Sequence, residues 1–116
     1  MSLQRFHVGQ RLSETAIFNK TIYLAGQIPE DTKQDIIGQT TEVLGHVDRL
    51  LAEAGSDKSQ ILMCQIFLSD ISQIDGMNQA WDAWVAKGNA PPRATVQAAL
   101  ANPEWLIEVV VTAAQK

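Results

Sequence analysis

The sequence predicts an α+β fold in which two helices cover one face of a β-sheet, within a single domain that spans residues 1–116. Runs rich in β-forming residues alternate with two amphipathic helical segments along the whole chain. No repeat, linker or low-complexity segment divides the chain. A length of 116 residues, with 46% hydrophobic and 19% charged residues, is typical of one globular domain.

A β-hairpin is the first element that the sequence predicts. Two β-rich runs, Ala16–Phe18 and Thr21–Leu24, are separated only by Asn19 and Lys20. Asparagine tolerates the positive φ of a two-residue hairpin turn. The sequence leaves open whether a further strand, at Arg5–Val8, precedes this hairpin.

The first helix is predicted from Asp35 to Ala54, where apolar residues recur at spacings of three and four. Before it, Pro29 should end the strand ladder, and Asp31 or Thr32 is able to cap the helix. After it, Gly55 occupies the position at which many helices end with a residue in the left-handed backbone conformation.

A buried strand and a second helix follow. The segment 59–70 is continuously apolar at its centre, which favours a strand. The second helix runs from Ser72 or Ile74 to Ala86, because its apolar residues form one stripe, and Gly88 is expected to close it.

Two further β-rich segments, 93–100 and 105–114, are joined by the turn "ANPE". The predicted order is therefore β-β-α-β-α-β-β, and two helices cover only one face of such a sheet. The apolar runs "ILMCQIFL" and "LIEVVVTAA" hold too few polar residues for an opposite face that is open to water. This pattern predicts a homo-oligomer.

Composition and charge argue against several partners and locations. The 9 basic and 13 acidic residues give a net charge of −4 with no basic run, so we expect no nucleic-acid partner. The N-terminal residues lack the layout of a signal peptide, and no apolar run reaches the length of a membrane span. We therefore expect a cytoplasmic protein without a membrane partner.

The usual catalytic and metal-binding motifs are missing from the sequence. His7, His46 and Cys64 are the only histidines and cysteine, and their spacing predicts no metal site. No G-x-S-x-G motif is present to place a hydrolase serine, and no nucleotide-binding glycine pattern is present, so we expect no tightly held nucleotide cofactor. Cys64 lies in an apolar run, which favours a structural thiol over a nucleophile.

Three polar residues remain as candidates for chemistry: Arg93, Glu108 and Asn78. Arg93 follows two prolines, and Glu108 interrupts the apolar run "LIEVVV", where a carboxylate needs a partner or a purpose. One interpretation is that Arg93 and Glu108 pair on adjacent strands or simply reach solvent. The other is that Arg93 binds a small carboxylate through its forked guanidinium, while Glu108 handles water or a proton.

The neighbouring residues leave similar alternatives open. Pro91 and Pro92 stiffen the loop before Arg93, which would reduce the entropy cost of binding, but they also suit the entry of a strand. The pair Trp81 and Trp84 has helical spacing, which favours packing over a stacking platform for a ligand. His46 is interpreted as a residue on the surface or edge of the first helix.

The segments "IYLAGQIPED", "QTTEVLGHVDRLLAEAGSDKSQILMCQIFLSDI" and "MNQAWDAWVAKGNAPPRATVQAALANPEWLIEVVVTAA" resemble, in order and spacing, the Rid family, also called the YjgF/YER057c/UK114 family. The block 77–114 is most similar to the YoaB-type branch. This resemblance implies a chorismate-mutase-like mixed sheet and a homotrimer. It also implies hydrolysis of 2-imino or enamine acids to 2-keto acids and ammonia, at clefts between subunits and without a cofactor.

The resemblance also implies roles for individual residues. Arg93 matches the arginine that clamps the substrate carboxylate, and Glu108 matches the glutamate that orients the attacking water. Asn78 matches an asparagine near the cleft, and the backbone of Gly26 and Gln27 matches a loop that lines it.

Three positions depart from the active deaminases of the family. Ala25 stands where they have serine, Thr95 where they usually have cysteine, and Leu12 where they have tyrosine. Threonine is still able to hydrogen-bond a ligand, whereas alanine and leucine lack a hydroxyl.

Two hypotheses of different classes follow. The first is an imine or enamine deaminase that acts in metabolite-damage control. The second is a non-catalytic trimer that senses a small carboxylate such as a 2-keto acid, or that meets a protein partner. Members of the family have also been labelled endoribonucleases or translation inhibitors, and the acidic balance argues against RNA binding.

Overall fold

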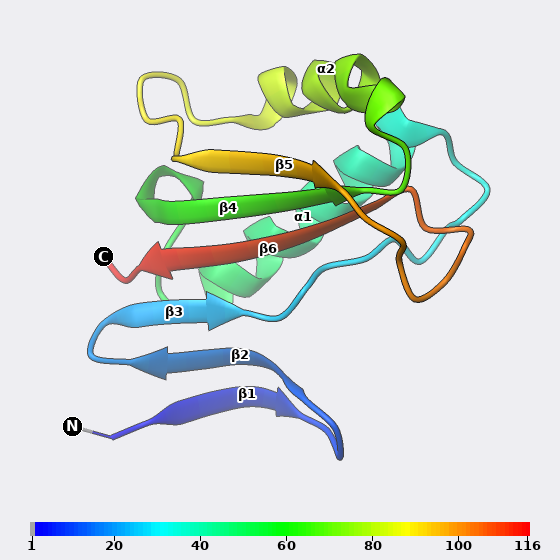
Figure 1. Ribbon diagram of the computed structural model, residues 1–116. Helices are drawn as coiled ribbons and strands as arrows, with labels where there is room; N and C mark the ends of the chain where they lie inside the picture. Colours follow the sequence, from blue (N-terminus) through cyan, green and yellow to red (C-terminus); the bar gives the residue numbers. More distant parts are fainter. Residues whose placement is uncertain (1) are drawn as a thin grey trace.

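The computed structural model describes residues 2–116, which form a six-stranded sheet with two helices packed against it (Figure 1). The elements, in chain order, are β1 (Gln4–Val8), β2 (Ser13–Phe18), β3 (Thr21–Leu24), α1 (Ile36–Glu53), β4 (Ile61–Leu68), α2 (Ile74–Trp84), β5 (Arg93–Gln97) and β6 (Ile107–Ala114). Short 3-10 turns precede β4 and α2. The predicted α+β class and the alternative N-terminal strand are both confirmed.

The sheet is mixed, with the strand order β1-β2-β3-β6-β4-β5. Only β4 and β5 run parallel, and every other pair is antiparallel. The last strand, β6, therefore lies in the middle of the sheet, while β5 forms an edge beside β4. Consequently β5 and β6 follow each other in sequence but do not touch as neighbours.

The hairpin turn has the backbone that its residues favour. Asn19 and Lys20 have φ values of 55° and 62°, which match a type I′ turn between β2 and β3. The register pairs Phe18 with Thr21 across this turn. The sequence prediction of a hairpin is confirmed.

The helices begin and end close to the predicted residues, with two corrections. Asp35 is the N-cap of α1 and accepts a hydrogen bond from the backbone of Gly38, so the prediction that Asp31 or Thr32 caps this helix was wrong. Gly55 follows α1 with a φ of 80°, as predicted. Helix α2 already ends at Trp84, so Gly88 forms a turn beyond the helix rather than closing it.

The connection between β5 and β6 is longer than predicted. β5 ends at Gln97, and residues 98–106 form an irregular loop that includes the predicted turn at 101–104. The fully buried side chain of Gln39 holds this loop against α1, since its amide donates to Glu104 O at 3.2 Å and accepts from Leu106 N at 2.8 Å. Its amide also donates to the carbonyl of Gln34 at 3.3 Å.

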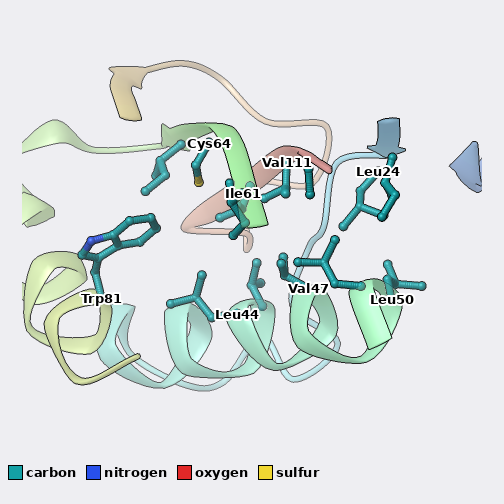
Figure 2. Close-up of a cluster of buried hydrophobic side chains, with 14 of the residues drawn as sticks. Leu24, Leu44, Val47, Leu50, Ile61, Cys64, Trp81 and Val111 are labelled. Carbon is teal, nitrogen blue, oxygen red and sulfur yellow. The ribbon is translucent and has the colours of Figure 1, made fainter. Parts of the chain in front are cut away.

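The hydrophobic core lies between the helices and one face of the sheet. Figure 2 shows Leu44, Val47 and Leu50 on the side of α1 that faces the strands, where Leu24, Cys64 and Val111 belong to the same cluster. The fully buried residues of β6 alternate with half-buried ones, which is the pattern of a strand covered on one face only.

No element within residues 2–116 covers the other face of the sheet. We call it the outer face, and define it by the large side chains exposed there: Phe18, Tyr23, Met63 and Val96. Their exposed fractions are 46%, 52%, 41% and 47%. Among residues 2–116, no helix has the length and apolar character needed to cross a membrane.

Candidate active site

Arg93 is the first residue of β5, and its side chain points toward the helices. It pairs in register with Cys64 of β4, whose buried side chain lies on the same face. The guanidinium Nη1 donates to Asn78 Oδ1 at 2.8 Å, and Cζ lies 4.9 Å from the ring centroid of Trp81. Helix α2 thus holds one corner and one face of the guanidinium.

The two prolines before Arg93 prove to be part of the strand entry. The carbonyl of Pro92 accepts a hydrogen bond from Cys64 N at 3.0 Å, which continues the ladder between β4 and β5. Proline is tolerated there because β5 is an edge strand and one side of it needs no backbone donor. The stiff entry fixes the backbone from which the arginine side chain starts.

Glu108 lies on the opposite face of the sheet. It is the second residue of β6, its register partner is Phe67, and its neighbours Ile107 and Val109 point into the core. The carboxylate is half-buried among apolar side chains of the outer face. No ion pair within residues 2–116 involves it.

Gly26 provides the space that the Glu108 carboxylate occupies. A Cβ atom built on Gly26 would lie 2.0 Å from Glu108 Oε2 and 2.9 Å from its Cδ. The next residue, Gln27, exchanges both backbone hydrogen bonds with Val109, at 2.7 and 3.0 Å, and is buried. Its side-chain amide donates to the carbonyl of Ala25 at 2.9 Å, so it fixes the loop itself.

The predicted site residues therefore fall into two groups. Arg93, Asn78 and Thr95 lie on the helix side at the β5 edge, whereas Gly26 and Glu108 meet on the outer face. The alternative that Arg93 and Glu108 pair on adjacent strands was wrong, because β4 lies between their strands. From strand spacing and register, their Cα atoms are roughly 14 Å apart.

Thr95 and Cys64 line the helix side of this edge. The hydroxyl of Thr95 is buried without a hydrogen-bond partner among the described residues. Burial raises the pKa of the Cys64 thiol to about 12, although the nearby Arg93 acts to lower it. The thiol is therefore protonated at neutral pH, which agrees with the structural role predicted for it.

A cavity of about 310 Å³ opens next to Gly26. It lies between the start of β2, the segment after β3 and helix α1. Leu12 and Ala25, two of the positions that depart from the family pattern, line it with apolar side chains. The other lining residues are Glu14, Gly26, Gln27, Ile28, Glu30, His46 and Arg49.

Three side chains come together in a cluster that the sequence analysis missed, and two of them, Glu30 and His46, also line this cavity. Glu30, Glu42 and His46 each offer one side-chain atom of the kind that binds metal ions, and these three atoms lie within 4.8 Å of one another. Glu42 accepts from the backbone of Glu30 at 2.7 Å and from the Gln34 side chain at 2.8 Å, and lies 3.1 Å from His46 Nε2. The sequence did contain one indication of this cluster, because Glu42 and His46 are four residues apart on α1 and side chains at that spacing are neighbours on a helix. The cluster ties the loop before α1 to the helix.

Comparisons with known proteins agree with this architecture. Residues 3–115 match the family model described as Endoribonuclease L-PSP. A RutC family protein of Haemophilus influenzae is 51% identical over 114 residues, which cover 97% of this chain and 98% of that protein. The RutC family protein YoaB of Escherichia coli is 43% identical, with 98% of this chain and 99% of the relative covered.

More distant relatives and solved structures extend the likeness. The 3-aminoacrylate deaminase RutC of Acinetobacter baylyi is 29% identical over 98 residues, covering 79% of this chain and 77% of that protein. The crystal structure of a YjgF family member from Neisseria meningitidis is 43% identical, with a TM-score of 0.97 over 100% of this chain and 97% of that chain. The chain therefore belongs to the Endoribonuclease L-PSP family, also known as the YjgF or Rid family.

Proposed function

We propose that this chain hydrolyses 2-imino or enamine acids to 2-keto acids and ammonia, in clefts that two copies of the chain build together, and so limits metabolite damage. The observation that carries the proposal is the separation of its two charged groups. Arg93 is held at a sheet edge and keeps N–H donors that Asn78 does not use. Glu108 lies on the outer face, which is apolar and uncovered. A second copy is needed to bring an arginine and a glutamate to one small molecule.

The arginine suits the carboxylate of such a substrate. A guanidinium carries five N–H donors in a planar fork, and Asn78 takes up only one of them. The remaining donors are able to bind a planar carboxylate in a two-pronged manner. In the assembled cleft, Asn78 would orient the clamp, and the hydroxyl of Thr95, which lacks a partner within the described residues, would offer one more hydrogen bond.

The glutamate suits the hydrolytic step. Glu108 accepts a proton from water as the water oxygen bonds to C2 of the protonated imine, whose π electrons move to nitrogen. The same carboxyl then returns the proton to the amine, and the C–N bond breaks with its electrons leaving on nitrogen. As it breaks, the C2 hydroxyl gives its proton to the Glu108 carboxylate and its O–H electrons form the carbonyl of the keto acid. Glu108 finally passes this proton to the departing ammonia, which leaves as ammonium. The imine carbon is already electrophilic, so positioning and proton transfer suffice and the proposed reaction uses no cofactor.

Enamine acids enter the same path after a proton adds to their β-carbon and turns them into imines. The 29% identical Acinetobacter baylyi relative is named a 3-aminoacrylate deaminase, and 3-aminoacrylate is an enamine acid with its nitrogen on C3. That name supports the deamination of enamine acids at the level of the family. The loop of Gly26 and Gln27 would form the wall of the cleft beside Glu108, where the glycine leaves room for the carboxylate.

The outer face supports a closed homo-oligomer. Tyr23 and Val96 are about half exposed on a sheet face that no helix within residues 2–116 covers, and exposed apolar surface of this kind favours burial against another subunit. We propose three copies, as the family resemblance implies, with their outer faces turned toward one another. We propose further that the trimer works in the cytoplasm on small carboxylates and has neither nucleic-acid nor membrane partners, in line with its net charge of −4.

The test is ammonia and keto-acid release from freshly generated 2-iminopropanoate and 2-iminobutanoate. Wild type should accelerate both, while Arg93→Ala and Glu108→Ala should each lose the acceleration. Arg11→Ala and Glu104→Ala are matched controls, because both side chains are exposed and neither belongs to the proposed site. A well-folded wild type that leaves both rates unchanged would contradict a deaminase acting on these substrates.

The lining of the cavity favours a second candidate, a trimer that binds a small carboxylate without turning it over. Leu12 and Ala25 supply no hydroxyl where the deaminases of the family have one. Under this hypothesis, Arg93→Ala abolishes binding of 2-oxobutanoate, and the wild type binds it without accelerating imine hydrolysis. Calorimetric titration of 2-oxobutanoate beside the ammonia assay separates the two candidates.

A further inference from the structure

The ring of Trp81 forms a platform under the guanidinium of Arg93. The 4.9 Å between Arg93 Cζ and the ring centroid lies inside the range of about 6 Å for a cation–π interaction. Trp81 is only 5% exposed and belongs to the core cluster that includes Cys64 (Figure 2). Because surrounding side chains exclude water from the ring, the attraction between ring and cation is weakly screened.

Trp81 and Asn78 act on the guanidinium from one helix. They are three residues apart on α2, so both side chains leave the same face of the helix toward β5. Asn78 fixes one nitrogen through a 2.8 Å hydrogen bond, while the ring fixes the tilt of the plane. A hydrogen bond at one corner alone would leave the fork free to rotate.

The neighbouring tryptophan has different partners. The indole of Trp84 donates to both carboxylate oxygens of Asp48 at 3.0 Å, and its ring carries Lys58 at 5.3 Å. The two rings contact each other with centroids 5.3 Å apart. Trp84 therefore shares the helix of Trp81 and packs against it, but the cation over its ring is Lys58 and not Arg93.

We propose that Trp81 is a positioning residue that preorganises Arg93 for binding a planar carboxylate, an inference that rests on the proposed function of Arg93 as the clamp. Trp81 does not touch the ligand. It lowers the entropy that the long arginine side chain loses when a carboxylate binds, because the side chain is already held in the free protein. Its effect must therefore pass entirely through Arg93.

The experiment measures the dissociation constant of 2-oxobutanoate by calorimetry. Trp81→Leu should weaken binding on the order of ten-fold, and Trp81→Phe by about three-fold, because phenylalanine keeps a smaller aromatic face. In turnover of 2-iminobutanoate, KM should rise while kcat stays near its wild-type value. Trp84→Leu is the control and should leave both constants within about two-fold, as it removes a partly buried tryptophan of the same helix, in contact with Trp81, without losing the arginine platform.

A double-mutant cycle with Arg93→Lys shows whether the effect passes through the arginine. Trp81→Phe should weaken binding less in the Arg93→Lys background than in wild type, since the guanidinium plane that the ring orients is gone. Equal losses in both backgrounds, or unchanged binding by both Trp81 variants, would overturn the inference. If Arg93→Ala itself binds 2-oxobutanoate as tightly as wild type, the proposed clamp fails, which is a different result from a failure of Trp81 alone.

Arginine side-chain NMR provides a readout that needs no ligand and no turnover. The Nε–Hε group of Arg93 should be rigid and shifted by the ring current in wild type, and mobile in Trp81→Phe or Trp81→Leu. It should stay rigid in Trp84→Leu. An Arg93 signal that is equally mobile in wild type and in the Trp81 variants would overturn the inference, whatever the protein binds.

Discussion

The backbone of Gly26 and the carboxylate of Glu108 occupy adjoining space so closely that no side chain fits between them. A Cβ atom on residue 26 would lie 2.0 Å from Glu108 Oε2, a separation that real structures do not contain. The position of the candidate catalytic carboxylate therefore depends on the absence of a side chain at residue 26, in the segment that follows β3.

Gly26→Ala should displace the Glu108 carboxylate without unfolding the protein, because the atom in conflict is the end of a flexible side chain. We expect imine hydrolysis to fall by at least about ten-fold, the scale of a misplaced catalytic group. The ammonia assay measures the fall, and circular dichroism shows whether the fold is retained.

Gly45→Ala is the matched control for this glycine. Gly45 lies exposed in α1, and an added Cβ meets no atom within 4 Å. Alanine should stabilise the helix by about 0.5–1 kcal/mol and leave hydrolysis unchanged. Equal activity losses in both glycine variants would show that the fit between Gly26 and Glu108 has no catalytic importance.

Gln39 should be costly to replace, because its buried side chain satisfies backbone groups of two loops. Gln39→Leu leaves the N–H of Leu106 and several carbonyls unpaired, and we expect a loss of about 2–4 kcal/mol in the free energy of unfolding. Urea denaturation measures it. Thr41→Ala, at an exposed position of the same helix, should change the free energy of unfolding by less than about 0.5 kcal/mol.

Glu42 should make the stability depend on pH in the acidic range. Burial acts to raise its pKa, but the N–H groups of Glu30 and Asp31 and the neighbouring His46 outweigh burial, so the pKa is lowered. A carboxyl with a lowered folded pKa stabilises the protein above its unfolded value, about 4.3, and the benefit is lost as pH falls through the folded value.

The comparison is between wild type and Glu42→Gln in thermal unfolding from pH 7 to pH 3. Wild type should have the higher Tm at pH 7, and the difference should shrink as the pH falls below about 4.5. A difference that stays constant across this range would mean that the charge of Glu42 does not contribute.

Cys64 should be inert in the folded protein. Its thiol is fully buried, and burial raises its pKa to about 12. We expect no reaction with a thiol-specific reagent at pH 8 until the protein is unfolded in denaturant. Rapid labelling under native conditions would show that the Cys64 thiol is accessible and reactive, which contradicts the structural role predicted for it.

Much of the fold follows from patterns within the sequence. Periodicity predicted α1 to within one residue at each end, and Asn19 with Lys20 predicted the hairpin turn that forms. The cap of α1 was missed because Asp31, Thr32 and Asp35 are all suitable residues, and only the path of the loop decides which side chain reaches Gly38. Such local choices depend on contacts with distant segments.

The arrangement of the site could be predicted only in part. Alternation correctly placed Glu108 on the face opposite Ile107 and Val109. The strand order could not be read from the sequence, since nothing local tells that β6 inserts between β3 and β4 and leaves β5 at the edge. That order separates Arg93 from Glu108.

In the proposed assembly, each site takes Arg93 from one copy and Glu108 from another. Mixing the inactive variants Arg93→Ala and Glu108→Ala under conditions that exchange subunits tests this arrangement most directly. Random mixing in a 1:1 ratio restores an intact pair at about one quarter of the sites, so imine hydrolysis should recover to about one quarter of the wild-type rate. A mixture that exchanges subunits but stays inactive would contradict a site shared between copies.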